Sequence, residues 1–269
     1  MAQITESKNF SFSDRVDEID FFAVGGGGSG GAAVDHVTSN SNGVAIGGAG
    51  GYTATKLGVK NIGLLFTAEI GAGGASKSCS AKGDVSRAEG SPGGSTTVKE
   101  RNEVILEAAG GNGGYATASY GNSNDTWSVG ADGGSGSSNM WAMYQNLGKA
   151  GHDGSDGSYI RSGKPGKGQG NTTTAFGEGV GTQFSPAGGS ASGYIYGSTL
   201  WYHGTDTVGP GGAPAVAESS SDAAYGSNAT VFGGGGGAAL AIKVANDTGT
   251  SVSGAGATGL VIARWRYKQ

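Results

Sequence analysis

Long uninterrupted runs of glycine constrain this chain more than any other feature of its sequence. Residues 25–28 and 233–237 are glycine throughout, and 58 of the 269 residues are Gly against only 5 Pro. Each glycine inside a helix costs about 1 kcal/mol relative to alanine, so long amphipathic helices are excluded. A continuous collagen triple helix is excluded as well, because it requires glycine at one third of its positions and abundant proline.

Short apolar runs that stop at glycine predict an all-β fold. They are rich in β-branched and aromatic residues, as strands bounded by turns are. Residues 98–109 are long enough for about three helical turns, but Val104-Ile105-Leu106 fits a strand better. We expect no substantial α-helix. The expected strands are Ile19–Val24, Leu64–Ile70, Thr96–Val98, Val104–Ala108, Ala239–Val244 and Leu260–Arg266.

The glycine-rich tracts between these runs have two interpretations. Glycine recurs at every third position over 148–157 and again at 163 and 166, which is the period of the polyproline II helix. Such segments can pack side by side and hydrogen-bond to one another, since glycine permits close backbone approach. Alternatively, the tracts are flexible Gly/Ser linkers. We favour packing, because Trp, Tyr and Phe interrupt the tracts and disordered segments are poor in aromatics.

Charge and targeting signals narrow the function classes. The 17 basic and 21 acidic residues give a net charge of −4, which does not suit a nucleic-acid-binding protein. The single cysteine, Cys79, excludes a disulfide framework within the chain. The N-terminal segment has neither the basic nor the apolar region of a secretion signal. The sequence also contains no apolar run of 18 residues, so it predicts no membrane span. We therefore expect synthesis in a cytoplasm and no membrane insertion.

One glycine motif matches the residue spacing of a nucleotide-binding fingerprint but lacks the structural context that the fingerprint requires. Gly25, Gly27 and Gly30 follow a strand with the spacing G-x-G-x-x-G. That motif requires a helix beginning at the third glycine, and the following AAVDHVTSNSNG is too short and polar to form it. We expect no cofactor.

No group of reactive side chains predicts catalysis. His36, His152 and His203 are scattered, and no GxSxG elbow accompanies them. Lysines on both sides of Cys79 can lower a thiol pKa, but without a neighbouring histidine we interpret Cys79 as an incidental thiol.

The acidic residues predict neither a metal site nor a hydrolase. Asp153 and Asp156 share one face of a period-three segment and, with Asp132, could offer oxygen ligands to Ca²⁺. They lack the spacing of a dedicated calcium loop, which favours ordinary solvated acids. Glycoside hydrolysis needs two opposed carboxylates, and no pattern among the acids selects such a pair. We expect a protein that is not an enzyme.

Aromatic residues in residues 116–230 are the main functional signal. Many lie among Gly, Ser, Asn and Thr, as in NSNDTWS and GSTLWYHGT. Tyrosine and tryptophan among small polar residues are typical of binding surfaces, although buried cores use large aromatics as well. Both interpretations stay open. The candidate receptor contacts are Trp127, Trp141, Tyr144, Trp201 and Tyr202.

The order of the glycine runs resembles a known family. FFAVGGGGSGG at 21–31 and GGAGGY at 47–52 are followed by IGAGG at 70–74 and AAGGNGGY at 108–115, and FGGGGGAALA at 232–241 precedes GAGATGLVIARW at 254–265. This order resembles the glycine-rich domain at the C-termini of phage tail fibres and adhesins. It is also similar to the glycine-rich domain of the anaplastic-lymphoma-kinase receptor class.

The resemblance implies a jelly-roll-like β-sandwich from which polyglycine or polyproline II segments project. It covers roughly residues 19–115 and 226–267. Residues 116–230 depart from the pattern, and we treat them as an aromatic-rich loop insertion in a glycine-rich β domain spanning 19–269. Residues 1–18 are polar and are expected to be an attachment arm.

The function that the resemblance implies is that of a virion structural or adhesive protein. We expect a phage tail-fibre tip or similar appendage that binds a protein or glycan receptor on a bacterial surface, forms homo-oligomers, and joins other virion or fibre subunits through its N-terminal arm. The alternative is a purely architectural capsid, tail or filament subunit whose exposed aromatics are covered by neighbouring subunits. An ice-binding protein is a further alternative, but the period-three register is too short for a regular binding face.

Overall fold

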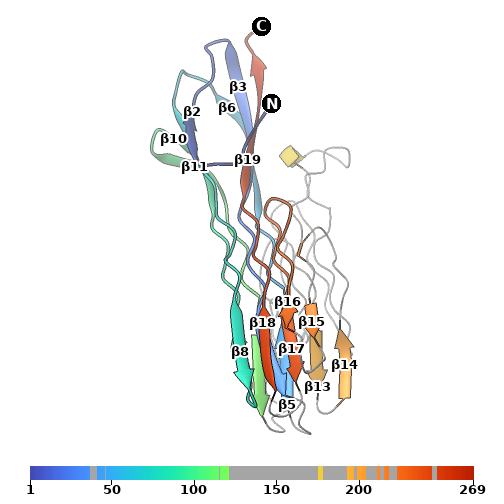
Figure 1. The fold of residues 1–269 in the computed structure, drawn as a ribbon. Helices are drawn as coiled ribbons and strands as arrows, with labels where there is room; N and C mark the ends of the chain where they lie inside the picture. Colours follow the sequence, from blue (N-terminus) through green and yellow to red (C-terminus); the bar gives the residue numbers. More distant parts are fainter. Residues whose placement is uncertain are drawn as a thin grey trace.

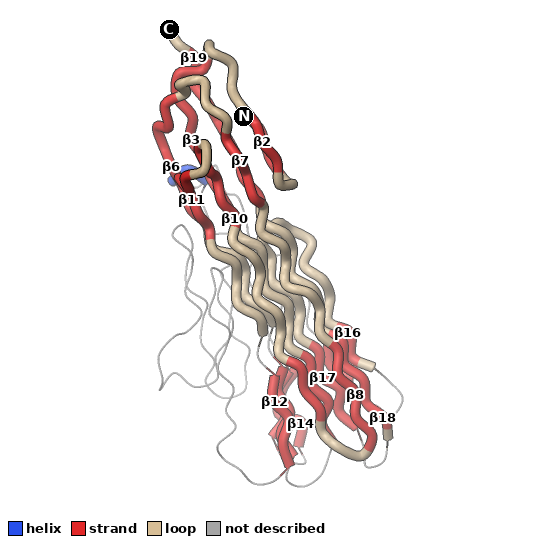
Figure 2. The backbone as a smooth tube through the Cα atoms, turned by 90° about the vertical axis from the view of Figure 1, so that its left-hand side faces the viewer, coloured by secondary structure: helices blue, strands red, loops and turns tan. Residues whose placement is uncertain are grey.

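The fold is almost entirely β-sheet and extended chain. The computed structural model describes residues 1–36, 41–45, 47–114, 116–120, 175–177, 193–196, 199–203, 211–212, 215–217, 223–243 and 247–269. These residues form β-strands and a single 3-10 turn. They contain no α-helix, as the sequence predicts. The described chain is elongated (Figures 1 and 2): a β-sandwich at one end, a stem of extended glycine-rich segments, and a second group of sheets, the distal sheets, at the other.

The sandwich consists of two four-stranded antiparallel sheets. The first sandwich sheet has the order β1 (Ala2–Ile4), β19 (Leu260–Tyr267), β3 (Val16–Val24) and β6 (Thr53–Lys60). The second sandwich sheet has the order β11 (Glu103–Ala108), β10 (Thr96–Glu100), β7 (Phe66–Glu69) and β2 (Lys8–Phe10).

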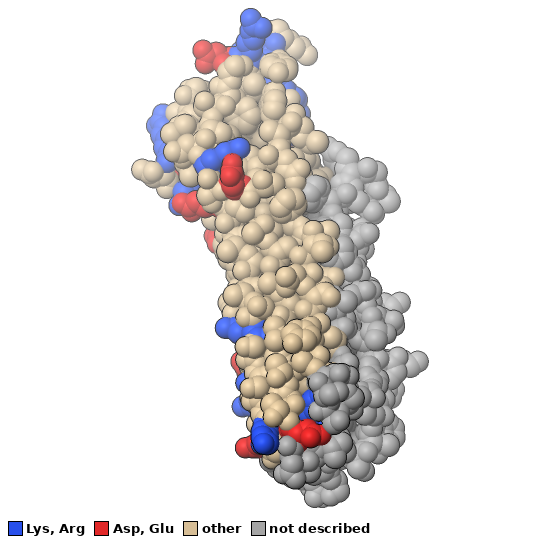
Figure 3. Space-filling model, viewed as in Figure 1, with Lys and Arg blue, Asp and Glu red and all other residues tan. Residues whose placement is uncertain are grey.

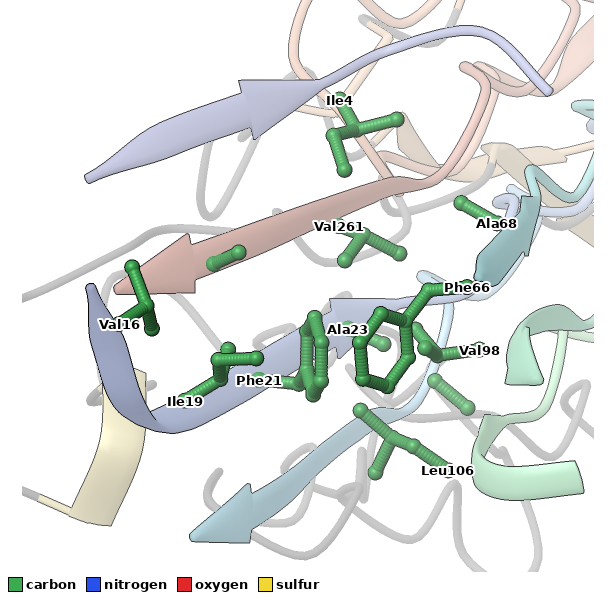
Figure 4. Packing of buried hydrophobic residues seen from close by; sticks show 12 residues of the cluster. Ile4, Val16, Ile19, Phe21, Ala23, Phe66, Ala68, Val98, Leu106 and Val261 are labelled. Atoms are coloured by element: carbon green, nitrogen blue, oxygen red, sulfur yellow. The ribbon is translucent and has the colours of Figure 1, made fainter. Parts of the chain in front are cut away.

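A hydrophobic core fills the space between the two sandwich sheets (Figure 4). Ile19, Phe21 and Ala23 alternate along β3 and face this core, because successive side chains of a strand point to opposite faces. The rings of Phe21 and Phe66 lie 5.4 Å apart and join the two sheets. Strand β3 therefore presents an apolar residue to this core at every second position from Ile19 to Ala23.

The segment predicted to be an arm contains two strands of the sandwich. β1 pairs with β19, and β2 pairs with β7. Ile4 and Val16 belong to the hydrophobic core. The boundary drawn after residue 18 from composition falls inside β3. Polar composition conceals these strands because most of their side chains are exposed.

The stem is organised around residues 25–31. The N–H groups of residues 25–30 donate in rotation to three neighbouring segments, and the rotation repeats after three residues. The three accepting segments are 47–52, 89–95 and 253–259. The carbonyl groups of residues 26–29 and 31 accept from three others, namely 70–77, 109–114 and 232–239. A three-residue turn with no internal hydrogen bonds sends its polar groups outward in this way.

Glycine is required where these segments touch. A Cβ added to Gly25, Gly26 or Gly27 would collide with the carbonyl oxygen of Ala109, Ala72 or Gly234, respectively. Each collision involves backbone, which cannot rotate away as a side chain can. The packed interpretation of the glycine tracts is therefore confirmed for the described tracts, whereas residues 148–166 lie outside the described residues.

The distal sheets continue directly from the stem. Segments 25–31 and 232–238 run in the same direction, so the strands that follow them, β4 (Ala32–His36) and β17 (Ala239–Lys243), pair in parallel. One sheet has the order β15 (Ala215–Ala217), β17 (Ala239–Lys243), β4 (Ala32–His36) and β9 (Ser86–Ala88). A second has the order β12 (Ala116–Tyr120), β5 (Ser41–Ala45), β13 (Gly193–Tyr196) and β14 (Thr199–His203). A third has the order β16 (Ala224–Tyr225), β18 (Thr248–Val252) and β8 (Ser78–Lys82).

Candidate functional site at the distal end

The distal end holds those candidate receptor contacts that the structure describes. Trp201 and Tyr202 lie in β14, which is the outermost strand of its sheet among the described residues. Trp127, Trp141 and Tyr144 lie outside the described residues. The structure therefore brings two of the five candidates onto one strand.

Register places a further tyrosine beside these two. β13 pairs antiparallel with β14, and Tyr194 is the partner of Tyr202. Tyr194 is also the partner of Val44 in β5. Strand β14 is thereby connected, through β13 and β5, to the segment 47–52 of the stem.

Another aromatic residue at this end was absent from the sequence-based set. Tyr225 in β16 is 63% exposed. Its neighbours read AAYGSN, the same mixture of small and polar residues that marks the other candidates. This local composition is the feature of the sequence that could have identified Tyr225 as a candidate. Tyr225 adds to the distal end an aromatic side chain that solvent reaches.

The distal sheets are supported by small side chains packed on both faces of β17. Leu240 and Ile242 face a cluster that contains Ala45 and Ala116. Ala239 and Ala241 face the opposite cluster, which contains Val34. Alanine-rich faces let neighbouring sheets approach closely, so the edge strand β14 extends from a densely packed base.

Two buried charged residues lie on opposite faces of the same pair of strands. Asp35 in β4 is 1% exposed and lies against Gly43 of β5. Lys243 in β17 is fully buried and lies against Gly249 of β18. Each glycine leaves room for a charged side chain.

The nucleotide-like motif belongs to the stem. Gly25, Gly27 and Gly30 lie in the central segment, and residues 32–36 form strand β4 where a nucleotide-binding loop would require a helix. The N–H groups of all three glycines bond to other stem segments. They are therefore committed to the protein backbone rather than to a phosphate.

Cys79 is a weakly acidic thiol. Burial raises its pKa to about 11, although the thiol donates a 3.7 Å hydrogen bond to the Ser86 carbonyl oxygen. The neighbouring lysines do not lower it. Since the thiolate is the nucleophile, this environment does not favour nucleophilic chemistry.

The remaining candidate groups are dispersed. His36 lies in β4 and His203 in β14, whereas His152, Asp132, Asp153 and Asp156 lie outside the described residues. Within the described ranges, no three His, Cys, Asp or Glu side chains gather as metal ligands would. In the part of the chain that the structure describes, no helix is long and apolar enough to cross a membrane.

Charged side chains gather mainly at the two ends of the face shown in Figure 3, and the stem between them presents mostly uncharged residues. At the sandwich end, Asp20 accepts hydrogen bonds from Arg264 Nε at 2.9 Å and from the Gly58 N–H at 2.8 Å. Arg266 lies 2.7 Å from Glu18. These pairs join β19, β3 and β6 and belong to the scaffold.

An open groove of about 350 Å³ lies beside β1, β2 and β19 at the sandwich end. Phe10, Phe12 and Trp265 line it, and Tyr267 contributes an exposed ring. The rings of Phe12 and Trp265 lie 5.3 Å apart. The two ends of the elongated molecule therefore both carry aromatic surface.

A comparison with protein-family models identifies one family along nearly the whole chain. The model described as a glycine-rich domain matches residues 4–266. No curated protein matches the chain. The match begins at Ile4, the last residue of β1, and includes all of β2.

Proposed function

Because this chain belongs to the glycine-rich domain family, we propose that it is a non-enzymatic structural and adhesive protein that presents its distal end to a receptor. The observation that carries the proposal is the separation of the two ends. Both termini lie at the sandwich end, and the stem holds the distal sheets away from them (Figure 1). An appendage needs this arrangement, with attachment at one end and recognition at the other.

The distal surface has the composition of a binding surface. Trp201 and Tyr202 lie on an edge strand, and Tyr225 is exposed on β16. Tyr and Trp supply large contact area at low conformational-entropy cost. Aromatic faces also stack on sugar rings, so a protein and a glycan on a bacterial surface are both suitable receptors.

The setting that we propose is a virion, with the domain as a phage tail-fibre tip or similar appendage. Residues 1–18, including β1 and β2, would face the other virion or fibre subunits. Homo-oligomers are expected by analogy with fibres. The support is the resemblance in the order of the glycine runs together with the elongated shape.

The test is binding of fluorescently labelled protein to a panel of Gram-negative and Gram-positive bacteria, after sizing by chromatography. We expect selective staining of some strains. The double variant Trp201→Ala/Tyr202→Ala should lose at least tenfold in affinity, as residues that carry binding do. Tyr267→Ala, which removes an exposed aromatic ring at the sandwich end, is the matched control and should stain normally.

Absence of staining by a folded, soluble protein would contradict the adhesive proposal. Polymerisation in the sizing step would instead favour the architectural alternative, in which neighbouring subunits cover the aromatic surfaces. Equal loss of staining in the control variant would show that binding does not depend specifically on the distal aromatic residues.

A further inference from the structure

Phe176 adopts a backbone conformation that bulky residues rarely take. Its φ of 62° and ψ of 16° lie in the left-handed region. Among the described residues, only Arg101 is another non-glycine residue with positive φ. A large side chain held in this region is an outlier that calls for a compensating interaction.

The compensating interaction is burial against the sandwich. Phe176 belongs to η1 (Ala175–Gly177) and is only 6% exposed. Its ring lies 6.0 Å from the ring of Phe22, and the Arg264 guanidinium carbon lies 4.2 Å from its centroid. That distance is within the range of a cation–π interaction.

The surface that receives Phe176 is the outer face of the first sandwich sheet. Phe22 and Val24 of β3 and Leu260 and Ile262 of β19 form it, with their side chains directed away from the main core. Arg264 is held over this surface by its 2.9 Å bond to Asp20. We call these five residues, Phe22, Val24, Leu260, Ile262 and Arg264, the socket.

The position of η1 in the chain gives this contact its meaning. The chain is in the distal sheets at Tyr120, reaches the sandwich at residues 175–177, and is in the distal sheets again at Gly193. Figure 2 shows η1 beside β6, at the sandwich end. Residues 175–177 are therefore a point in the insertion that is fixed far from the strands on either side of it.

We propose that residues 175–177 are a latch that fastens the insertion to the sandwich by placing Phe176 in the socket. The latch is separable: the socket residues also belong to β3 and β19, whose pairing does not involve η1. Opening the latch exposes an apolar surface with a cation at its edge, while the sandwich and stem stay folded. This inference concerns the chain's own contacts and does not depend on the receptor-binding proposal.

The test is hydrogen–deuterium exchange of the full chain in three forms: the natural sequence, Phe176→Ala and Phe12→Ala. We expect the amides of residues 175–177, followed in a peptide spanning 171–180, to be protected in the natural sequence and to exchange at least tenfold faster in Phe176→Ala. Phe12→Ala is the matched control, because Phe12 packs on the opposite face of the same sheet. It should leave the 171–180 peptide unchanged.

Two results would overturn the latch. One is unprotected exchange of the 171–180 peptide in the natural sequence. The other is simultaneous loss of protection in β3, β19 and the latch in Phe176→Ala, which would show that η1 is not separable. If Phe176→Ala does not fold, Phe176→Leu keeps the apolar contact and removes the ring beneath Arg264. That variant should still release the 171–180 peptide by a measurable factor, and unchanged exchange would count against the cation–π contact as the fastening.

Discussion

At the residue scale, some positions of the stem tolerate a side chain and others do not. The central glycines are surrounded by backbone, and a Cβ there meets carbonyl oxygens. Ala72 and Ala75, in contrast, are exposed on segment 70–77. Composition alone predicts that glycine matters, but it does not tell an inward glycine from an outward one, because that depends on which segments become neighbours.

We predict that Gly27→Ala destabilises the protein by about 3 kcal/mol or more, at or above the upper end of the usual cost of overpacking. The added methyl group would collide with the Gly234 carbonyl. For a chain of this size the midpoint of thermal unfolding should fall by roughly 6–12 °C. Ala75→Ser, at an exposed stem position, is the control and should change the midpoint by less than about 1 °C. A Gly27→Ala protein as stable as the natural one would refute the stem packing.

A second prediction concerns Cys79, the only cysteine in the chain. Because burial raises its pKa from 9.0 to about 11, alkylation by iodoacetamide at pH 8 should be at least tenfold slower in the folded protein than in denaturant. The same shift stabilises the fold fully below pH 9, and this contribution is lost as the pH rises to about 11. Cys79→Ala should lack that part of the alkaline dependence. Equal alkylation rates in both states would exclude the burial.

At the element scale, the expected strands appear where apolar residues alternate or cluster. The six predicted runs correspond to β3, β7, β10, β11, β17 and β19. Strand β6 was missed, because TATKLGVK alternates weakly and three of its eight residues are exposed. Strands β4 and β5 were missed because their residues are small, polar or charged.

The sequence does not predict which of these strands pair with each other. β3 pairs with β19, which lies at the opposite end of the chain, and β4 pairs in parallel with β17. Both pairings follow from the way the stem segments pack. The Phe176 contact with Arg264 was missed for the same reason, since nothing near residue 176 in the sequence indicates a partner at residue 264.

Asp20 provides a test at this scale, because it joins three strands of the first sandwich sheet. Burial raises its pKa, but the Gly58 N–H bond and the nearby Arg264 and Arg266 outweigh burial and hold the pKa below its usual value. Asp20→Asn should cost about 2 kcal/mol, less than the roughly 3–5 kcal/mol for a fully buried pair, since Arg264 is 33% exposed.

The acid dependence supplies the readout for Asp20. A lowered pKa stabilises the fold above the ordinary aspartate pKa, and this contribution is lost as the pH falls through the lowered value. Denaturant unfolding below pH 4 should therefore show a smaller decline for Asp20→Asn than for the natural protein. Parallel declines in the two proteins would remove Asp20 from the acid response.

At the whole-molecule scale, the sequence correctly predicts an all-β domain with packed glycine segments. It does not predict that the stem separates two groups of sheets, because length and composition contain no information about where segments lie along an axis. The candidate site was predicted only as a set of residue types, and the structure describes two of those five residues, on β14.

The elongated shape gives a prediction for solution scattering. A compact domain of 269 residues has a radius of gyration of roughly 18 Å. We expect X-ray scattering from the monomer to give a clearly larger value and a skewed distance distribution. A value at or below that of a compact domain would contradict the separation of sandwich and distal sheets.

The central segment 25–31 has a mechanical consequence. A polyproline II chain rises about 3.1 Å per residue, and a fully stretched chain reaches only about 3.3–3.6 Å. Tension between the distal sheets and the sandwich can therefore lengthen the stem by only about a tenth before it loads covalent bonds. Such tension loads the hydrogen bonds between the segments together in shear. The stem is therefore stiff and nearly inextensible along its axis.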